Sequence, residues 1–483
     1  MTRAVVRRGR PHRELLLAVA ASLAVFFVHF RPWQAGMLED WGLALAWDAE
    51  GLHGLIARVP ATLGRPLHLV PHYVGMVLSD GGFVGPYLVL AVVVVLQFLG
   101  ARWAVSALGA PKPVAFVLAL AIALHPWWPA GDILRFLPAQ CAVLGGVLWL
   151  GAATRYVRSG GGWWWAGTVV VPALGLLAYQ APAGAIALCA VALALLGEGP
   201  VKRRVVMVVS TVASVLAVLM WSIVVAPRLS PGSYEATLGG TSVDVVASLR
   251  AIARTVVREA PSLILLGGLI ALLVIVLALR GRLPRPAALL LLAGLAITPF
   301  AAMIYAAQPL HLNDPERVAL PIGLALWLLT CVFARWIPAT GRLPLAVAVA
   351  AGALAVLGAA FGYSMWTSYA VLQRELLDAV EPVRDQVRSD EELVVLDGSG
   401  LYGDVYTFLP PHLNVAVDVE LGDGPDVAVC TPARTPRDHP IAARYPLPTT
   451  PSCEELLDGV HVRELDAVTI EGRILVLVAA EAP

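Results

Sequence analysis

The chain has 483 residues, of which 58% are hydrophobic and only 14% are charged. A soluble globular protein carries about 25% charged residues, so this composition excludes a fully water-soluble chain and predicts that most of it contacts lipid. Lysine plus arginine and aspartate plus glutamate each number 34, and the resulting net charge of zero gives no indication of a nucleic-acid partner.

The apolar residues form a series of runs, each long enough to cross a bilayer. A transmembrane helix needs about 20 mostly apolar residues, because its backbone must satisfy its own hydrogen bonds across the hydrocarbon. The sequence therefore predicts a polytopic α-helical membrane protein with about eleven transmembrane helices. The predicted helices are 14–30, 83–101, 113–129, 136–153, 163–179, 181–197, 204–226, 261–280, 286–305, 318–335 and 343–364.

Basic residues predict the orientation of these helices. If the N-terminus lies in the cytoplasm, every short loop on that side is basic, which agrees with the positive-inside rule. Those loops contain Arg102, Lys112, Arg155, Arg158, Lys202, Arg203, Arg204, Arg280, Arg282, Arg285, Arg335 and Arg342. An odd number of helices then places the C-terminal part outside, and we expect a multi-pass protein of a bacterial-type plasma membrane. The first helix is expected to remain as a signal anchor, because no small-residue cleavage site follows its apolar run.

The charge distribution divides the chain in two. Residues 1–365 form a membrane module, and residues 366–483 have the composition of a small extracytoplasmic α/β domain. In that domain the sequence predicts a charged helix and four strands. The helix is expected over 370–389, and the strands at Leu393–Asp397, Asn414–Val419, Asp426–Cys430 and Ile474–Val478.

The chain has five cysteines, two of them in the predicted outer domain. Oxidising conditions outside the cell would permit a disulfide between Cys430 and Cys453. No spacing of cysteine and histidine resembles a metal cage, so no metal site is predicted. The sequence leaves open whether a divalent cation takes part in the chemistry.

The first outer loop, residues 31–82, carries an adjacent carboxylate pair, Glu39 and Asp40, followed by an amphipathic stretch over 44–59. A carboxylate in a partly apolar setting can act as a general base, and two adjacent carboxylates tend to separate their pKa values. The alternative is a solvated loop or a helix N-cap, since Asp40 begins a helical pattern.

A stripe of arginines lies in another outer loop, residues 227–260. Arg250, Arg254 and Arg258 are spaced by four, so a helix would place them on one face. They are the main departure from the positive-inside rule. Arginine binds phosphate through two parallel hydrogen bonds. The stripe therefore fits either a lipid phosphate or diphosphate, or nonspecific contact with anionic headgroups.

Three short motifs resemble the GT-C glycosyltransferases, which use polyprenyl-phosphate sugars. These motifs are Glu39-Asp40-Trp41, Gly64-Arg65-Pro66-Leu67 and Leu177-Ala178-Tyr179-Gln180. Their order and their common side of the membrane, over roughly residues 14–335, are most similar to the serotype-converting O-antigen glucosyltransferases. The C-terminal domain carries no such resemblance.

The resemblance implies an inverting sugar transfer in one step. Asp40, assisted or replaced by Glu39, would deprotonate an acceptor hydroxyl on a glycan or lipid-linked acceptor. That oxygen would displace the phosphate of a polyprenyl-phosphate-linked sugar donor. The arginines expected to stabilise the departing phosphate are Arg65, Arg135, Arg250, Arg254, Arg258 and Arg317. The residues expected to bind the sugar or the acceptor are Trp41, His68, Asp132, Tyr179, Gln180 and His311.

Three other classes of membrane protein fit the sequence less well than a glycosyltransferase. A flippase or other transporter of lipid-linked sugars would need polar groups along a path through the helices, and the predicted helices are apolar. A membrane-bound acyltransferase would be expected to place a histidine deeper in the membrane than His29, His125 or His311. A non-catalytic assembly protein of the cell envelope would not need carboxylates facing arginines. The glycosyltransferase is favoured, with the transporter and the assembly protein as alternatives.

Overall fold

The structure is a computed structural model of the chain. It describes residues 11–32, 36, 39–124, 134–231, 245–303, 315–338, 341–397, 410–422, 424–430, 452–470 and 473–481.

Within these described ranges, seven helices are long and apolar enough to cross a membrane, judged by length and composition. They are Val84–Ala107, Leu134–Ser159, Val201–Leu229, Pro261–Leu279, Arg285–Ala302, Arg317–Trp336 and Arg342–Arg384. The remaining four predicted spans fall on shorter apolar helices, at Glu14–His29, Lys112–Leu124, Gly162–Ala178 and Ala183–Leu196. These helices support a multi-pass membrane protein, and the count of eleven spans stays a prediction.

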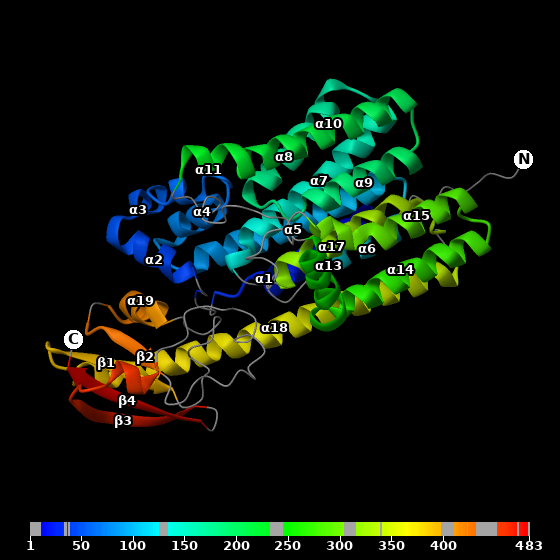
Figure 1. The fold of residues 1–483 in the computed structure, drawn as a ribbon. Coiled ribbons are helices and arrows are strands. Elements are labelled where there is room, and N and C mark those ends of the chain that lie inside the picture. The colour runs from blue at the N-terminus through cyan, green and yellow to red at the C-terminus, as the bar shows by residue number, and fades with distance from the viewer. Residues whose placement is uncertain are drawn as a thin grey trace, which may run out of the picture.

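The apolar helices form one elongated bundle (Figure 1). Its members are α1 (Pro11–His29), α5 (Val84–Ala107), α6 (Lys112–Leu124), α7 (Leu137–Ser159), α8 (Gly162–Ala178), α9 (Ala183–Leu196), α10 (Val201–Met220), α14 (Pro261–Leu279), α15 (Arg285–Ile297), α17 (Pro315–Phe333) and α18 (Arg342–Arg384). Small residues allow close packing between neighbours, as is common among membrane helices. A Cβ atom on Gly145 of α7 would lie 3.0 Å from the Cα atom of Gly175 of α8.

Short helices cover one end of the bundle. The first outer loop, expected to hold a single amphipathic stretch, contains α2 (Glu39–Glu50), α3 (Leu52–Ile56) and α4 (Val70–Ser79). Two more helices follow α10, namely α11 (Ala226–Leu229) and α13 (Val245–Arg254). Figure 1 shows α2, α3 and α4 at the same end of the bundle as the C-terminal sheet.

The C-terminal part contains a sheet of four strands in the order β2-β1-β4-β3. The strands are β1 (Glu391–Asp397), β2 (Val427–Cys430), β3 (Val462–Ile470) and β4 (Arg473–Glu481). β1 pairs parallel with β2 and antiparallel with β4, and β3 pairs antiparallel with β4. A disulfide joins Cys430 at the end of β2 to Cys453 at the start of α20 (Cys453–Leu456), with 4.9 Å between their Cα atoms.

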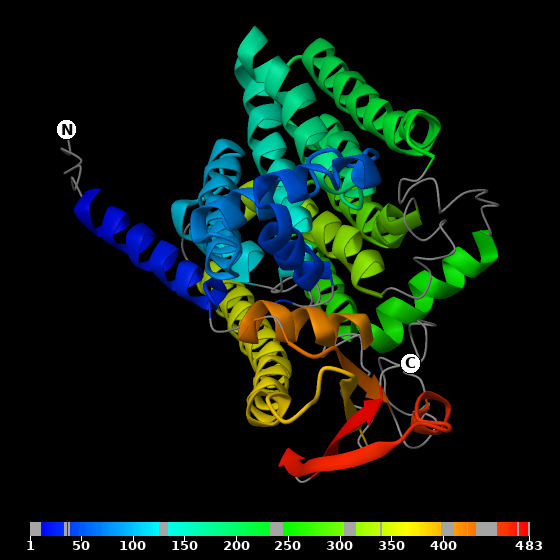
Figure 2. The same cartoon turned by 90° about the vertical axis from the view of Figure 1, so that its left-hand side faces the viewer.

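The strand predicted at Asn414–Val419 is wrong. These residues belong to α19 (Pro410–Leu421). Their alternating valines resemble a strand, but burial of Leu413, Ala416 and Val417 follows the spacing of one helix face. This helix contacts β2 and also α2, and Figure 2 shows it lying across the blue helices of the first loop.

Two further elements differ from the sequence prediction, one in its extent and one in its existence. The charged helix expected over 370–389 is the continuation of α18, which runs without a break from Arg342 to Arg384. Strand β3 was not predicted, because Arg463, Glu464 and Asp466 interrupt its apolar pattern. Edge strands tolerate such charges, which protect them from pairing with other chains.

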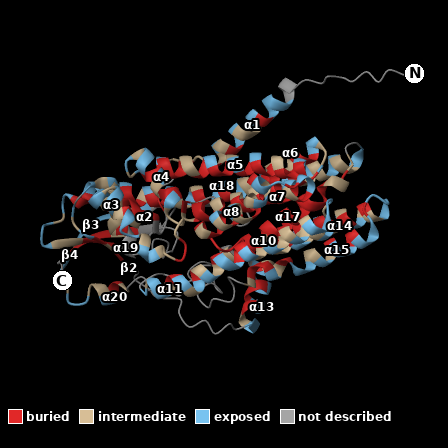
Figure 3. Cartoon of the chain, turned by 90° about the horizontal axis from the view of Figure 1, so that it is seen from above, coloured by how far each residue is buried: buried red, intermediate tan, exposed pale blue. Residues whose placement is uncertain are grey.

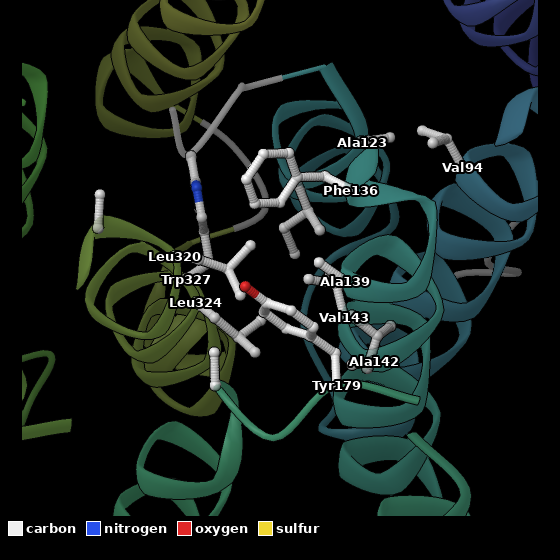
Figure 4. Close-up of a cluster of buried hydrophobic side chains, with 14 of the residues drawn as sticks. Val94, Ala123, Phe136, Ala139, Ala142, Val143, Tyr179, Leu320, Leu324 and Trp327 are labelled. Carbon is white, nitrogen blue, oxygen red and sulfur yellow. The ribbon is translucent and has the colours of Figure 1, made fainter. Parts of the chain in front are cut away.

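The buried core runs along the middle of the bundle. In Figure 3 the buried positions concentrate on α7 and α17, and all the residues of α17 from Val318 to Phe333 are buried. Figure 4 shows Ala139, Val143, Tyr179, Leu324 and Trp327 packed where α7, α17 and the end of α8 meet. Tyr179 therefore lies at the end of the core that the short helices cover.

Candidate active site

A cavity of about 280 Å³ opens at this covered end of the bundle. Its walls come from α2, the loop before α4, α4 itself, the short helix Leu134–Phe136, the end of α8 and the start of α17. The lining residues are Asp40, Leu43, Arg58, Ala61, Thr62, Arg65, His68, Leu69, His72, Arg135, Phe136, Tyr179 and Arg317. Among the described lining residues, the cavity thus combines one carboxylate with four guanidinium groups and two imidazoles.

Asp40 lies in the first turn of α2, which begins at Glu39. A carboxylate at this position faces the positive end of the helix dipole. Its Oδ1 atom is 3.7 Å from Nε2 of His72 on α4, and both side chains are only 4% exposed. Nε2 of His72 is also 2.9 Å from the carbonyl oxygen of Leu134, so an N–H there donates to that oxygen. This bond holds the short helix that contains Arg135 beside the carboxylate.

The loop that carries Arg65 is fastened to the membrane helices by buried hydrogen bonds. Ser222 Oγ donates to the carbonyl oxygen of Gly64 at 2.6 Å, and Gln180 Nε2 donates to the same oxygen at 3.2 Å and to Ser222 Oγ at 2.9 Å. Trp221 Nε1 donates to the carbonyl oxygen of Leu63 at 3.0 Å. Two of the motifs that carried the resemblance, 64–67 and 177–180, therefore lie against each other.

His68 is held against the end of α8. Its Nδ1 atom is 3.1 Å from the carbonyl oxygen of Ala178, and its ring stacks on that of Tyr179 with 6.3 Å between ring centres. Burial, reinforced by the nearby positive charge of Arg65, lowers the pKa of His68 well below its ordinary value of 6.5. The ring is therefore neutral at physiological pH, with Nδ1–H donating to Ala178 and Nε2 left as an acceptor.

The four arginines differ in exposure. Arg65 is buried at 6% exposure, Arg135 and Arg317 are partly buried, and Arg58 on the rim is exposed. Arg135 also lies over the ring of Phe136, with 5.7 Å from its Cζ atom to the ring centre. Because guanidinium groups stay charged at any physiological pH, the described lining of the cavity carries more positive than negative charge. Such an arrangement suits an anionic ligand.

The cavity brings together six of the residues predicted as catalytic or binding residues, namely Asp40, Arg65, Arg135, Arg317, His68 and Tyr179. Two others serve the packing around it. Trp41 is fully buried and packs edge-on against Phe83, with 5.0 Å between ring centres. Gln180 makes the hydrogen bonds that hold the Arg65 loop.

The rest of the predicted set lies elsewhere. Arg250, Arg254 and Arg258 do not belong to the lining of the cavity. Asp132 and His311, and the side chain of Glu39, lie outside the described part of the chain. Among the described residues, no three His, Cys, Asp or Glu side chains are grouped as metal ligands.

Three polar lining residues were not in the predicted set: Arg58, Thr62 and His72. His72 follows His68 by four residues, so a helical reading of this stretch would have placed both imidazoles on one face. Arg58 lies near the end of the amphipathic stretch of the first loop. The sequence shows its charge but not which residues surround it in the fold.

No protein-family model and no curated protein matches this sequence. The membership of the serotype-converting family therefore stays a prediction.

Three solved structures have a chain path that is loosely similar to that of this protein. An archaeal oligosaccharyltransferase, AglB from Archaeoglobus fulgidus, in complex with an inhibitory peptide and a dolichol-phosphate, is 15% identical, with a TM-score of 0.43 over 78% of this chain and 58% of that chain. The arabinofuranosyltransferase AftD from Mycobacteria is 19% identical, with a TM-score of 0.43 over 87% of this chain and 32% of that chain. ArnT from Cupriavidus metallidurans, bound to undecaprenyl phosphate, is 14% identical, with a TM-score of 0.44 over 97% of this chain and 98% of that chain. Two of these structures are named as glycosyl-transferring enzymes, and two contain a polyprenyl-type phosphate, namely dolichol-phosphate and undecaprenyl phosphate.

Proposed function

We propose that this chain is an integral membrane glycosyltransferase. It transfers a sugar from a polyprenyl-phosphate donor to a hydroxyl group of a cell-envelope glycan or lipid-linked acceptor, with inversion at the anomeric carbon. The side of the membrane is the extracytoplasmic one, on which the positive-inside rule places the loops that build the cavity.

One observation carries this proposal. The cavity sets the buried carboxylate of Asp40 among Arg65, Arg135 and Arg317 at the end of an apolar helix bundle. The transfer needs a group that takes a proton and groups that hold a phosphate beside the lipid. Both are present within one cavity of about 280 Å³.

The chemistry assigns a role to each group. The carboxylate of Asp40 takes the proton of the acceptor hydroxyl as its oxygen bonds to the anomeric carbon. The bond from that carbon to the phosphate oxygen breaks, and the electron pair leaves with the phosphate. The phosphate gains negative charge in this step, and the arginines stabilise that charge where it develops. Neutral His68 is placed to accept a hydrogen bond from a sugar hydroxyl.

The test uses the purified full chain in detergent with a panel of radiolabelled polyprenyl-phosphate sugars and a glycan acceptor. We expect one or more donors to release lipid phosphate in equal amount to labelled product. Nuclear magnetic resonance of that product should show the anomeric configuration opposite to that of the donor. A retained configuration would contradict the single-step mechanism, and transport of the intact donor across proteoliposomes without its cleavage would favour the transporter.

A further inference from the structure

A basic surface outside the cavity lies on α13 and the π-helical turn that follows it, Thr255–Glu259. Arg250, Arg254 and Arg258 are all exposed there. Leu249 and Val257 are exposed beside them, at 41% and 62%. The opposite face is buried in the protein through Ser248, Ala251, Ile252 and Thr255. The outward face therefore pairs three cations with large aliphatic side chains, which we call the α13 face.

The position of this helix gives its depth in the membrane. The helix α14 begins at Pro261, only three residues after Arg258, and is apolar enough to cross the membrane. The α13 face therefore lies where the hydrocarbon meets the headgroups. The helix also contacts α17, and Figure 3 shows it at the periphery of the bundle. The side chains of its outward face are exposed in the described part of the chain.

We propose that the α13 face is a binding surface for anionic phospholipid headgroups of the leaflet on the cavity side. Leu249 and Val257 reach into the acyl region, while the arginine stems lie along the interface and their guanidinium groups bind phosphate. Water alone would be a poor partner for the exposed aliphatic side chains, and hydrocarbon alone would be a poor partner for three guanidinium groups. An anionic headgroup layer satisfies both.

The proposal does not rest on the proposed sugar transfer, because the α13 arginines do not belong to the lining of the cavity. It also gives these basic residues, which depart from the positive-inside rule, a role in lipid contact. Each basic residue at an anionic surface contributes roughly fivefold in affinity at low salt. Three such contributions multiply to roughly a hundredfold before screening by salt, so the removal of all three should abolish the local enrichment of anionic lipid.

The experiment reads the lipid composition beside α13 in the full-length protein. Cys141, Cys189 and Cys331 are replaced by alanine, and a bimane probe is attached to Ala253→Cys, an exposed position on α13. The protein is reconstituted in phosphatidylcholine vesicles with about 20 mol% phosphatidylglycerol, with either one of the two lipids brominated as the quencher. The control probe is attached to Leu272→Cys, an exposed position on α14 within the hydrocarbon.

At position 253 we expect stronger quenching per molecule by the brominated phosphatidylglycerol than by the brominated phosphatidylcholine. At position 272 the two lipids should quench equally. The triple variant R250Q/R254Q/R258Q should abolish the preference, while R250K/R254K/R258K should keep most of it. Added sodium chloride should weaken the preference in the protein that keeps all three arginines. This test does not depend on the folding of an arginine variant.

Three results would overturn the proposal. Equal quenching by both lipids at position 253 would show that no anionic lipid is enriched there. A preference that survives R250Q/R254Q/R258Q and high salt would place its cause elsewhere. A loss of preference on adding inorganic phosphate, beyond that caused by sodium chloride of the same ionic strength, would mean that the face binds free phosphate groups.

Discussion

Ser222 and Gly64 lie 158 positions apart in the sequence, yet the hydroxyl of Ser222 donates a 2.6 Å hydrogen bond to the carbonyl oxygen of Gly64. Gln180 donates to the same oxygen and to the hydroxyl of Ser222. Because Gly64 immediately precedes Arg65, these bonds place the buried guanidinium of the cavity on the membrane helices. The site is therefore held by groups that are not among its lining residues.

This relationship predicts the effect of Gln180→Leu. The change removes a buried donor and leaves the Gly64 carbonyl with one partner fewer, at a cost of about 1–3 kcal/mol in the free energy of unfolding. It should also raise KM for the donor, because the Arg65 loop is released. Donor kinetics together with thermal unfolding in detergent measure both effects.

Gln97→Leu provides the matched control. Gln97 makes buried hydrogen bonds to Gln140 between α5 and α7, and it does not line the cavity. Its loss should lower stability to a similar degree while leaving KM unchanged. If both variants shift KM alike, the hydrogen bonds of Gln180 have no special role in positioning Arg65.

Asp40→Asn should nearly abolish sugar transfer without loss of the fold. An amide has almost the shape of a carboxylate and keeps the helix start, but it cannot accept the proton, so kcat should fall by about 10²–10⁴. Asp48→Asn, at an exposed position on the same helix, should retain normal turnover. Asp40→Asn with an unchanged kcat would remove the catalytic base from the proposed mechanism.

The lowered pKa of His68 predicts a loss of stability in mild acid. Below about pH 6.5 the unfolded chain binds a proton at this position and the folded chain does not, so the free energy of unfolding decreases by up to about 1.4 kcal/mol per pH unit. Its contribution is complete above the unfolded-state pKa and is lost as the pH falls below it. Between pH 7.5 and 5.5, the melting temperature of the His68→Asn variant should therefore fall by less than that of the unmodified protein. Parallel melting curves would argue against a neutral, buried His68.

The disulfide predicts a thiol count. The structure leaves Cys141, Cys189 and Cys331 free and bonds Cys430 to Cys453. Denatured protein should titrate three thiols before reduction and five after it. Closing a loop of 23 residues stabilises the folded state by about 3 kcal/mol in the chain-entropy model, so Cys430→Ala with Cys453→Ala should lower the stability of the C-terminal domain. Five thiols before reduction would contradict the bond.

The sequence by itself determined the membrane class and the polar end of the molecule. Transmembrane helices can be predicted from runs of apolar residues without tertiary information, because the bilayer imposes a length on each helix. The candidates Asp40, Arg65, Arg135 and Arg317 lie in the loops between such runs, and the resemblance to the GT-C enzymes implied their roles. The structure brings them into one cavity.

Only the tertiary structure decided which polar residues face that cavity and which support it. Trp41 and Gln180 carry side chains suited to sugar binding, yet one packs on Phe83 and the other holds Gly64. Asn414–Val419 has the alternation of a strand, yet it forms a helix because α2 and β2 offer a surface for Leu413 and Val417. In each case the partner lies far away along the chain, and local pattern carries no information about a contact that long-range packing creates.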